Sequence, residues 1–286
     1  MTDKSIGTRV LRRLWTMALG ERSWVSRTGD FRTRERYGLV GRPNYAYGML
    51  RAADTARYFG HDQVTIVEFG VASGAGLINM SDLAGLISLE TGVSFKIYGF
   101  DTGAGLPELR GPKDHPEIWN AGDFTMEDRA TLERRLAGRA TIIWGDIEQT
   151  IGPFVRELNP QVPVGFVSVD VDIYSATMSA LKLFDGDVLN YLPAVSMYFD
   201  DVGFFFANHW AGELAAINEF NEAHALRKID RDRSLPSDRR PGGPRSWYGH
   251  MYACHLLDHP RRQTSMPRSQ LTINAHARFM TENALF

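Results

Sequence analysis

The sequence predicts an α/β fold in which a mostly parallel sheet carries helices on both faces. Short apolar runs rich in β-branched residues alternate along the chain with longer segments of helical periodicity, as they do in parallel sheets with crossover helices. A glycine-rich bend follows the first of these runs, and acidic residues follow several of the others. Ligands bind at the carboxyl ends of strands in such sheets, so this acidity indicates a site rather than scattered surface charge.

The composition is that of an ordinary globular protein. Of its 286 residues 43% are hydrophobic and 23% charged, so we expect one main domain with additional segments. A net charge of −2 argues against a dedicated nucleic-acid binder. Charge is uneven, because residues 1–60 carry +7 and the remainder −9. We expect the basic amino-terminal portion to be a solvated helical face or an assembly surface, through which copies of the chain would form a homo-oligomer.

The single cysteine, Cys254, excludes an internal disulfide and a zinc site built from several cysteines. It suits a reducing compartment. The apolar run from Leu14 to Leu19 is too short for a signal-peptide core or a membrane span. We therefore expect a soluble, cytoplasmic protein without a membrane partner.

Residues 1–41 are expected to form an amino-terminal helical cap. Apolar residues recur among its arginines at roughly helical spacing, namely Leu11, Leu14, Trp15, Met17 and Leu19. Pro43 then marks the start of a helix that runs to about Phe59. Within that helix we expect Tyr47 and Met49 to be core residues, with contact to a ligand as the alternative.

The first strand, at 65–69, leads through Gly70, Gly74 and Gly76 into a helix at 77–91. Glycines let the backbone approach a ligand, and a helix start offers unpaired N–H groups. The spacing fits neither a dinucleotide fingerprint nor a P-loop. Glu68, two places before the first glycine, suits a ligand with cationic groups, such as S-adenosylmethionine. The alternative is a tight turn in some unrelated α/β protein.

The second strand, at 94–100, ends in Asp101, which is placed to accept both hydroxyls of a ribose. The segment at 102–124 is rich in glycine and proline and is expected to pass over the site. We interpret its His115 as an exposed loop histidine, with a substrate contact as the alternative.

A helix is expected to open at Thr125 with a capping box and to end near Gly138. The third strand, at 141–144, leads to Asp146. This side chain either caps the next helix, at 147–158, or binds the adenine amino group of a cofactor.

The remaining elements continue the alternation up to residue 224. They are a strand at 164–169, a helix at 176–191, a strand at 195–199 and a helix at 212–224. Residues 231–245 form a loop that we expect to be mobile, and 246–257 partly alternate as a closing edge strand would. The main domain thus spans 42–258, and 259–286 form a carboxy-terminal tail.

Three aspartates follow the fourth and fifth strands. Asp170 precedes the pair Asp200 and Asp201 by one strand–helix–strand crossover. A right-handed crossover places adjacent strand ends about 5 Å apart, and carboxylates that close repel one another unless a cation lies among them. Oxygen ligands favour Mg²⁺. The alternative is that one aspartate caps a helix while the others are solvated or paired.

Asp172 follows Asp170 at a spacing of two. If the chain is still extended there, both side chains point into the site, whereas the alternative is that Asp172 caps the following helix. A metal beside a methyl donor suggests methylation of an oxygen atom, because coordination acidifies a hydroxyl. A carboxylate bound to the metal is a weakened base, so Asp172 is the better candidate for the catalytic base and Asp170 the second.

At these residues the chain resembles the macrocin O-methyltransferase family, over roughly residues 43–257. The matching motifs are Val67-Glu68-Phe69-Gly70-Val71, Phe100-Asp101 with Gly105-Leu106-Pro107, Asp170-x-Asp172-x-Tyr174-x-x-Thr177, Phe199-Asp200-Asp201 and Ala215-Ala216-Ile217-Asn218-Glu219-Phe220. The chain departs from the family pattern at Ala176-Thr177 and at Leu192-Pro193-Ala194.

The resemblance implies a Rossmann-like class I methyltransferase fold, with a mostly parallel seven-stranded sheet. It implies an S-adenosylmethionine- and Mg²⁺-dependent enzyme that methylates a hydroxyl of a small molecule, such as a sugar of a glycosylated natural product. Glu68 with Gly70, Ser73 and Gly74 would bind the methionine part of the cofactor, and Asp101 the ribose.

The resemblance also implies roles for the acidic motifs. Asp170, Asp200 and Asp201 would bind Mg²⁺, and Asp172 would be the catalytic base. Two other readings remain: a nucleotide-sugar glycosyltransferase that uses Asp170-Val171-Asp172, which leaves the glycine bend unexplained, and a non-catalytic binding protein on a methyltransferase scaffold.

Overall fold

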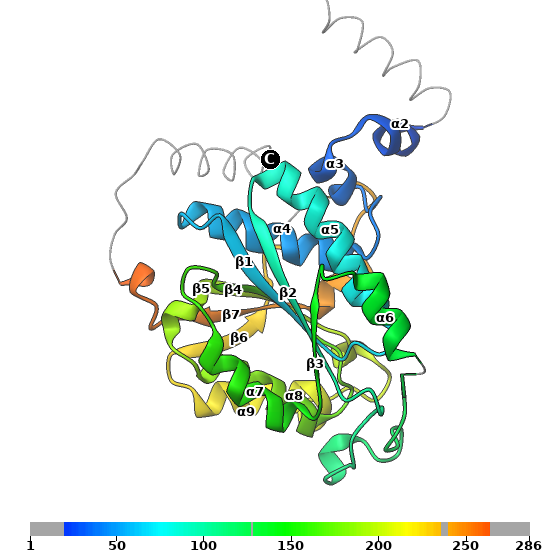
Figure 1. The fold of residues 1–286 in the computed structure, drawn as a ribbon, viewed down its shortest axis with the longest axis vertical. Coiled ribbons are helices and arrows are strands. Elements are labelled where there is room, and N and C mark those ends of the chain that lie inside the picture. Colours follow the sequence, from blue (N-terminus) through cyan, green and yellow to red (C-terminus); the bar gives the residue numbers. More distant parts are fainter. Residues whose placement is uncertain (1–19, 127, 236–239, 264–286) are drawn as a thin grey trace, which may run out of the picture.

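The computed structural model describes residues 20–126, 128–235 and 240–263 (Figure 1). Its sheet has seven strands in the order β3-β2-β1-β4-β5-β7-β6, and only β7 runs antiparallel to its neighbours. The predicted Rossmann-like fold with a mostly parallel seven-stranded sheet is confirmed. The strands are β1 Gln63–Phe69, β2 Ser94–Asp101, β3 Thr141–Trp144, β4 Val164–Val169, β5 Tyr191–Phe199, β6 Arg227–Arg231 and β7 Met251–Leu256.

Helices cover both faces of the sheet, as predicted. Figure 1 shows α4 and α5 on one face and α7, α8 and α9 on the other. The α-helices are α2 Glu21–Thr28, α3 Phe31–Arg36, α4 Pro43–Tyr58, α5 Ala75–Thr91, α6 Arg129–Leu136, α7 Ile147–Glu157, α8 Tyr174–Leu181 and α9 Gly212–Ala223. The short 3₁₀ segments that bear on the site are η1 Pro112–Asp114 and η4 Asp201–Gly203.

The amino-terminal segment is helical where the structure describes it. Helices α2 and α3 lie before the main domain, and the side chain of Asp30 caps α3 by accepting the N–H of Thr33. The apolar residues on which the helical prediction rested, from Leu11 to Leu19, lie outside the described residues. The role of this segment in assembly stays a prediction.

The helix after β4 is shorter than expected, and β5 begins earlier. Helix α8 ends at Leu181 and passes into 3₁₀ turns, whereas the sequence predicts a helix to 191. Gly186 interrupts the helix with an extended backbone, and the Tyr191 hydroxyl accepts its N–H. The same hydroxyl donates to the carbonyl of Leu183. Tyr191 therefore closes the turn and starts the strand.

The far edge of the sheet differs from the prediction. The strand expected within 246–257 is present as β7, but it lies inside the sheet between β5 and β6, so its predicted edge position is wrong. Residues 246–250 form a 3₁₀ turn, and the true edge is β6, in which Ile229 alone is buried. A polar edge strand has no apolar alternation, and this explains why the sequence pattern did not reveal it.

The segment predicted as a mobile loop at 231–245 is held where it is described. Arg231 ends β6. The Tyr47 hydroxyl donates to Asp232 at 2.7 Å, and Arg240 forms a buried ion pair with Glu35 of α3. These contacts join the segment to α3 and α4.

The helix predicted to open at Thr125 begins four residues later. Asp128 is the N-cap of α6 and accepts the N–H of Thr131 at 2.9 Å. The Thr125 hydroxyl instead donates to the carbonyl of Gly122. The capping box is therefore wrong, because the side chain that satisfies the helix start is Asp128.

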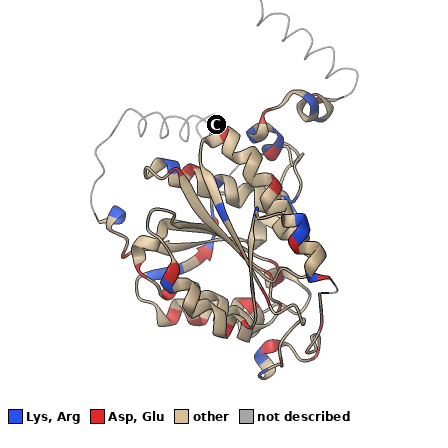
Figure 2. Cartoon of the chain, in the orientation of Figure 1, with Lys and Arg blue, Asp and Glu red and all other residues tan. Residues whose placement is uncertain are grey.

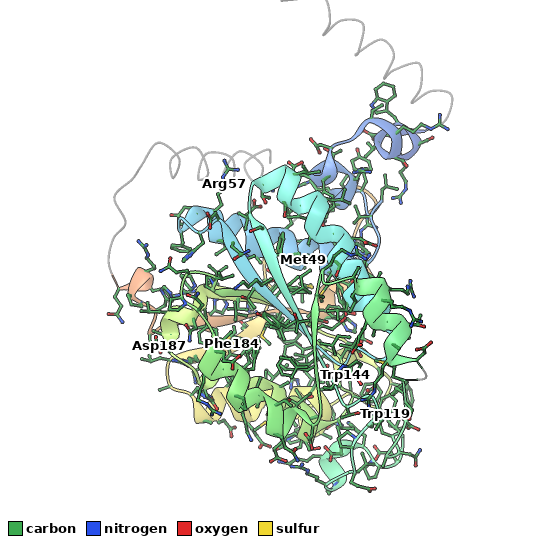
Figure 3. The ribbon with its side chains drawn as sticks, viewed as in Figure 1. Met49, Arg57, Trp119, Trp144, Phe184 and Asp187 are labelled. Atoms are coloured by element: carbon green, nitrogen blue, oxygen red, sulfur yellow. The ribbon has the colours of Figure 1, made fainter. Side chains whose placement is uncertain are left out.

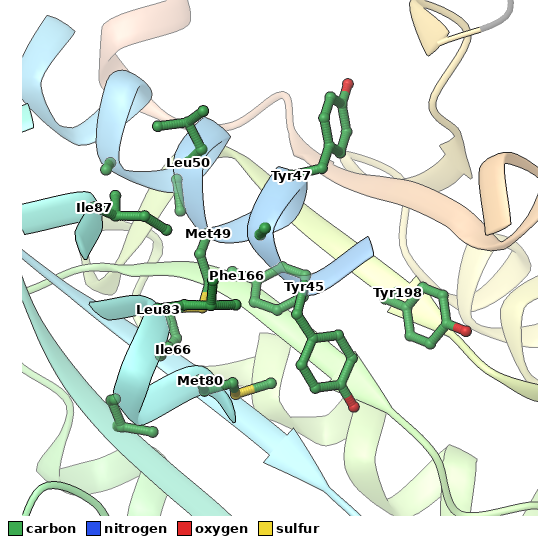
Figure 4. Close-up of a cluster of buried hydrophobic side chains, with 14 of the residues drawn as sticks. Tyr45, Tyr47, Met49, Leu50, Ile66, Met80, Leu83, Ile87, Phe166 and Tyr198 are labelled. Atoms are coloured by element: carbon green, nitrogen blue, oxygen red, sulfur yellow. The ribbon is translucent and has the colours of Figure 1, made fainter. Parts of the chain in front are cut away.

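Two apolar layers pack against the sheet. On the α4–α5 side, Tyr45, Met49 and Met80 meet Ile66 and Phe166 of the central strands (Figure 4). The opposite layer holds the helices α7, α8 and α9, as the side chains around Phe184 in Figure 3 show. Met49 and Tyr47 are buried, so their prediction as core residues is confirmed.

Charged residues lie mainly on the outer helices and connecting loops (Figure 2). Among the described residues, we find no helix with the length and apolarity needed to cross a bilayer.

Gly70 gives a test of how tightly the central strand ends pack. Its φ is +85°, and a methyl group there would lie 1.7 Å from the carbonyl oxygen of Asp170. We expect Gly70→Ala to destabilise the fold by more than Gly92→Ala does. Gly92 has a φ of +75° but no atom near a methyl position, so that control costs only the left-handed backbone, about 1 to 2 kcal/mol.

The steric clash at Gly70 adds about 1 to 3 kcal/mol to that backbone cost. Urea unfolding of both variants measures the difference. Equal decreases in the free energy of unfolding of the two variants would show that the strand ends are not in close contact.

Candidate functional site

A cavity of about 370 Å³ opens where β2, β1, β4 and β5 end. Backbone hydrogen bonds continue past the strands there, from Gly70 N–H to Phe100 and from Asp170 N–H to Phe69. Chain order reverses between β1 and β4, which is the switch point where such sheets bind ligands. The volume lies within the range of about 300 to 1,000 Å³ for small-molecule sites.

The residues that line the cavity come from the strand ends and from the segment at 102–124, which was predicted to pass over the site. They include Gly70, Ala72, Phe100, Asp101, Thr102, Gly105, Leu106, Pro107, Arg110, Trp119, Phe124, Asp146, Ile147, Asp170, Val171, Asp172, Ser175, Ala176, Ser179, Asp200 and Asp201.

Only part of the glycine bend reaches this cavity. Gly70 and Ala72 line it, and Ala72 has a left-handed backbone with a φ of +44°. Ser73 is exposed, and Gly74, the N-cap of α5, packs against Leu132. Neither lines the cavity, so cofactor contacts by Ser73 and Gly74 stay predictions.

Glu68 is buried beneath the bend rather than in the cavity wall. Its Oε1 accepts the Tyr45 hydroxyl at 2.8 Å, and that hydroxyl also accepts a bond from Ser168. Gly76 lies directly above it, because a methyl group there would be 1.9 Å from Glu68 Oε1. Burial raises the pKa of Glu68 to about 8. A direct contact of Glu68 with the cofactor stays a prediction.

Asp101 binds the bend to the end of β2. One carboxylate oxygen accepts the N–H groups of Val71 and Ala72 at 2.9 and 2.8 Å, and the other accepts Gly103 N–H at 2.5 Å. The side chain lines the cavity, where it was predicted to meet a ribose.

Asp146 shows the capping geometry. It is the N-cap of α7 and accepts the N–H of Glu148 at 2.8 Å. It also lines the cavity, and Ile147 and Phe100 provide apolar wall nearby. The capping role is confirmed, and the contact with an adenine stays a prediction.

Four carboxylates gather in the other half of the cavity, as the sequence predicts. Asp170, Asp172, Asp200 and Asp201 all line it. Burial, followed by the neighbouring carboxylates, raises the pKa of Asp170 to about 7 and that of Asp172 to about 8. Burial and Asp200 raise the pKa of Asp201 to about 7. The charges of these aspartates therefore interact strongly, because the strands that carry them end at the same edge of the sheet.

Asp172 reaches the cavity by an unexpected route. Strand β4 ends at Val169, and Asp172 has a left-handed backbone with a φ of +60°. The N–H of Ile173 donates to the carbonyl of Val171, which closes a tight turn around Asp172. Ile173 is the N-cap of α8, without a side-chain cap. Both the extended backbone and the capping alternative are wrong, although Asp170 and Asp172 do share the cavity.

Sequence reasoning missed two groups that hold these aspartates. The Tyr198 hydroxyl donates to Asp200 at 2.6 Å, and Glu213 of α9 accepts the backbone N–H of Asp201 at 2.9 Å. Tyr198 and Asp200 are two residues apart, a spacing that places them on one side of a strand and was a usable signal. Glu213 left no local signal, because its contact depends on where α9 packs.

His115 is buried, so its interpretation as an exposed loop histidine is wrong. Its side chain is 3% exposed, its Nδ1 lies 2.8 Å from Glu117, and its ring packs edge-on against Phe204. The excursion at 102–124 folds back onto the site, and His115 faces the protein interior.

The donor chemistry suits a hard divalent cation. The carboxylates of Asp170, Asp200 and Asp201 line one cavity, and the buried Oδ2 of Asp201 has no hydrogen-bond partner in the part of the chain that the structure describes. Oxygen donors of this kind favour Mg²⁺. Within the described ranges, no three acidic, histidine or cysteine side chains are already arranged around one metal position.

No protein-family model and no curated protein matches this chain. Among solved structures, the calicheamicin methyltransferase CalS11 is similar at 21% identity over 72% of this chain and 78% of its own, with a TM-score of 0.48. The O-methyltransferase NovP is 12% identical over 75% and 80%, with a TM-score of 0.47. An O-methyltransferase from Bacillus cereus in complex with SAH is 12% identical over 86% and 97%, with a TM-score of 0.39. Because these TM-scores are below 0.5, we base the function on the site itself.

The buried carboxyl of Glu68 predicts a pH-dependent stability. Its pKa of about 8 lies above the ordinary 4.5, so the unfolded chain releases this proton first as pH rises. The stability that the protonated group gives below pH 4.5 is therefore lost progressively up to pH 8. Glu68→Gln keeps an acceptor for Tyr45 and carries no such proton, so its melting temperature should exceed the wild-type value increasingly from pH 5 to 8.

Glu219→Gln is the control of opposite sign. Hydrogen bonds from Lys113 and Tyr174 lower the pKa of Glu219 below the ordinary 4.5. The stability that its carboxylate gives is therefore present above pH 4.5, and any decrease in the melting temperature of Glu219→Gln appears there. Parallel melting curves for Glu68→Gln and the wild type across this range would contradict the burial of a protonated Glu68.

Proposed function

We propose that this protein is an S-adenosylmethionine-dependent O-methyltransferase that acts on a hydroxyl of a small molecule with the help of Mg²⁺. The observation that carries this proposal is the composition of one cavity at the switch point. The glycine bend and Asp101 form one half of it, and four mutually repelling aspartates form the other. A cationic methyl donor and a divalent cation both fit such a charge.

The cofactor half suits the donor in chemistry and size. Gly70 brings backbone to the cavity edge, Asp101 offers acceptors where a ribose would lie, and Asp146 lies beside apolar wall suited to an adenine. Arg110, the cation that lines the cavity, is paired with Glu148 at 2.5 Å, so the wall is left mainly acidic. In this proposal Glu68, Ser73 and Gly74 support the methionine end of the donor from beneath and beside the bend.

The acceptor half holds and deprotonates the hydroxyl. Asp170, Asp200 and Asp201 would hold Mg²⁺, which would acidify the acceptor hydroxyl, and S-adenosylmethionine would supply the methyl group from its sulfonium and leave as S-adenosylhomocysteine. Asp172 takes the hydroxyl proton onto its carboxylate, and Asp170 is the second candidate for that role. The tight turn around Asp172 fixes the direction of the base. The cavity walls contribute mainly by holding the oxygen and the methyl donor in line.

The acceptor class rests on the sequence motifs. Their resemblance to macrocin O-methyltransferases favours a sugar hydroxyl of a glycosylated natural product. We further propose a cytoplasmic protein that binds neither nucleic acid nor membranes and assembles through its amino-terminal segment.

The deciding experiment is a ligand screen on the full chain. Binding of S-adenosylhomocysteine, measured by calorimetry and by thermal shift with and without Mg²⁺, should raise the melting temperature in a concentration-dependent manner. Binding of a nucleotide sugar without binding of S-adenosylhomocysteine would replace this proposal with a glycosyltransferase. Binding of S-adenosylhomocysteine without methyl transfer to any hydroxyl acceptor would favour a non-catalytic protein.

The base is tested by Asp172→Asn. This change keeps the size of the side chain but removes the proton acceptor, so we expect turnover to fall by about 10²- to 10⁴-fold. Affinity for S-adenosylhomocysteine should be unchanged, because Asp172 lies in the acceptor half. Asp82→Asn, on the exposed surface of α5, is the control. Turnover near the wild-type rate in Asp172→Asn would move the role to Asp170.

A further inference from the structure

Three buried polar atoms lie without partners next to the acidic half of the cavity. They are Nε2 of His115, Oδ2 of Asp201 and Oε1 of Glu213, and none has a hydrogen-bond partner among the described residues. The side chains of His115 and Glu213 are only 3% and 1% exposed. Buried polar atoms are nearly always paired in native proteins, so three such atoms in one region need an explanation.

The three side chains come from different elements, and the start of α9 contacts Asp201 and also lies beside His115. Glu213 Oε2 accepts the Asp201 N–H at 2.9 Å. A methyl group on Gly212, the residue before Glu213, would lie 3.3 Å from His115 Nε2. The start of α9 thus contacts the strand end at Asp201 on one side and the 102–124 excursion on the other.

Both neighbours of Asp201 are held firmly. Helix α9 fixes Glu213, which lies in the first turn of that helix. His115 has a left-handed backbone with a φ of +53°, a bond from Nδ1 to Glu117, and an edge-on contact with Phe204. Its second nitrogen is therefore directed inward, and neither side chain turns easily toward solvent.

A purely structural role does not account for this arrangement. The side chain of Glu213 is buried beside Asp201 and its Oε1 has no partner among the described residues, so the fold bears the cost of an unsatisfied buried carboxyl oxygen there. An apolar residue at 213 would avoid that cost but would leave the Asp201 N–H unpaired. The arrangement is explained if Glu213 and His115 hold the carboxylate of Asp201 in place.

We propose that Glu213 and His115 are positioning residues that fix the backbone and the carboxylate of Asp201 for binding a divalent cation. Supporting groups of this kind typically change metal affinity by about 10- to 100-fold. This inference rests on the proposed function, because it takes Asp201 as a metal ligand. It adds two residues that would contact neither the substrate nor the metal.

The test measures Mn²⁺ affinity of the full chain by electron paramagnetic resonance, with S-adenosylhomocysteine affinity measured by calorimetry in parallel. Glu213→Leu removes the acceptor, and His115→Phe keeps a ring against Phe204 but removes both nitrogens. Each should weaken Mn²⁺ binding by about tenfold or more. Glu213→Gln retains an acceptor for the Asp201 N–H and should restore most of the affinity. Affinity for S-adenosylhomocysteine should not change in any variant.

Glu222→Leu, on an exposed position of the same helix, is the matched control and should leave both affinities unchanged. Unchanged Mn²⁺ affinity in a folded Glu213→Leu would overturn the inference, as would an equal loss in Glu213→Gln. If Glu213→Leu does not fold, His115→Phe decides, because unchanged Mn²⁺ affinity in that variant would overturn the inference.

Failure of the parent proposal is distinguishable from failure of this inference. A wild-type chain that binds S-adenosylhomocysteine but no Mn²⁺ would overturn this inference and the role of Mg²⁺ in the proposed function, and would leave S-adenosylmethionine-dependent methylation standing. A wild-type chain that binds Mn²⁺ with all variants equal to it would overturn this inference alone.

Discussion

Burial of like charge at one edge of the sheet is the constraint on which the site depends. Five carboxyl groups there have pKa values raised first of all by burial: Glu68, Asp170, Asp172, Asp201 and Glu213. Each is costly to ionise in that position, and together they repel one another. A fold selected for stability alone would replace some of them with apolar residues. Perturbed groups of this kind cluster at functional sites, so the cost itself supports a role in binding.

The order of the strands in the sheet divides this site into two halves. Strand β1 lies between β2 and β4, so the end of β1 borders Asp101 on one side and Asp170 on the other. Gly70 packs directly on the Asp170 carbonyl, and Asp101 holds the N–H groups of the bend. A shift of the bend therefore changes the positions of both halves together. The close contact at Gly70 keeps the two halves of the cavity at a fixed separation.

The sequence predicted the elements whose burial produces a simple pattern. Strands β1 to β4 and helices α4, α5 and α7 follow apolar patterns in the sequence, and β1 and β4 are buried along nearly their whole length. It failed where local backbone chemistry or edge position overrides that pattern. Gly186 ends the α8 region early, and β6 shows only one buried residue because it lies at the sheet edge.

The site was predictable to the extent that it depends on strand ends. Asp101, Asp170, Asp200 and Asp201 line the cavity because each follows a strand, which is visible in the sequence. The burial of His115 and the contact of Glu213 depend on how a loop and a helix pack against those ends. No spacing rule links residues 115, 201 and 213, so only the tertiary structure brings them together.

The backbone at the cavity supports a preformed site. Ala72, Phe124 and Asp172 line the cavity with left-handed backbones, which cost non-glycine residues about 1 to 2 kcal/mol each. Such strain persists only where the surrounding structure holds it, and it is concentrated at functional sites. In each case the strained residue presents a side chain or an N–H to the cavity region. The fold thus fixes the shape of the cavity before a ligand enters, as the proposed in-line transfer between two bound molecules would require.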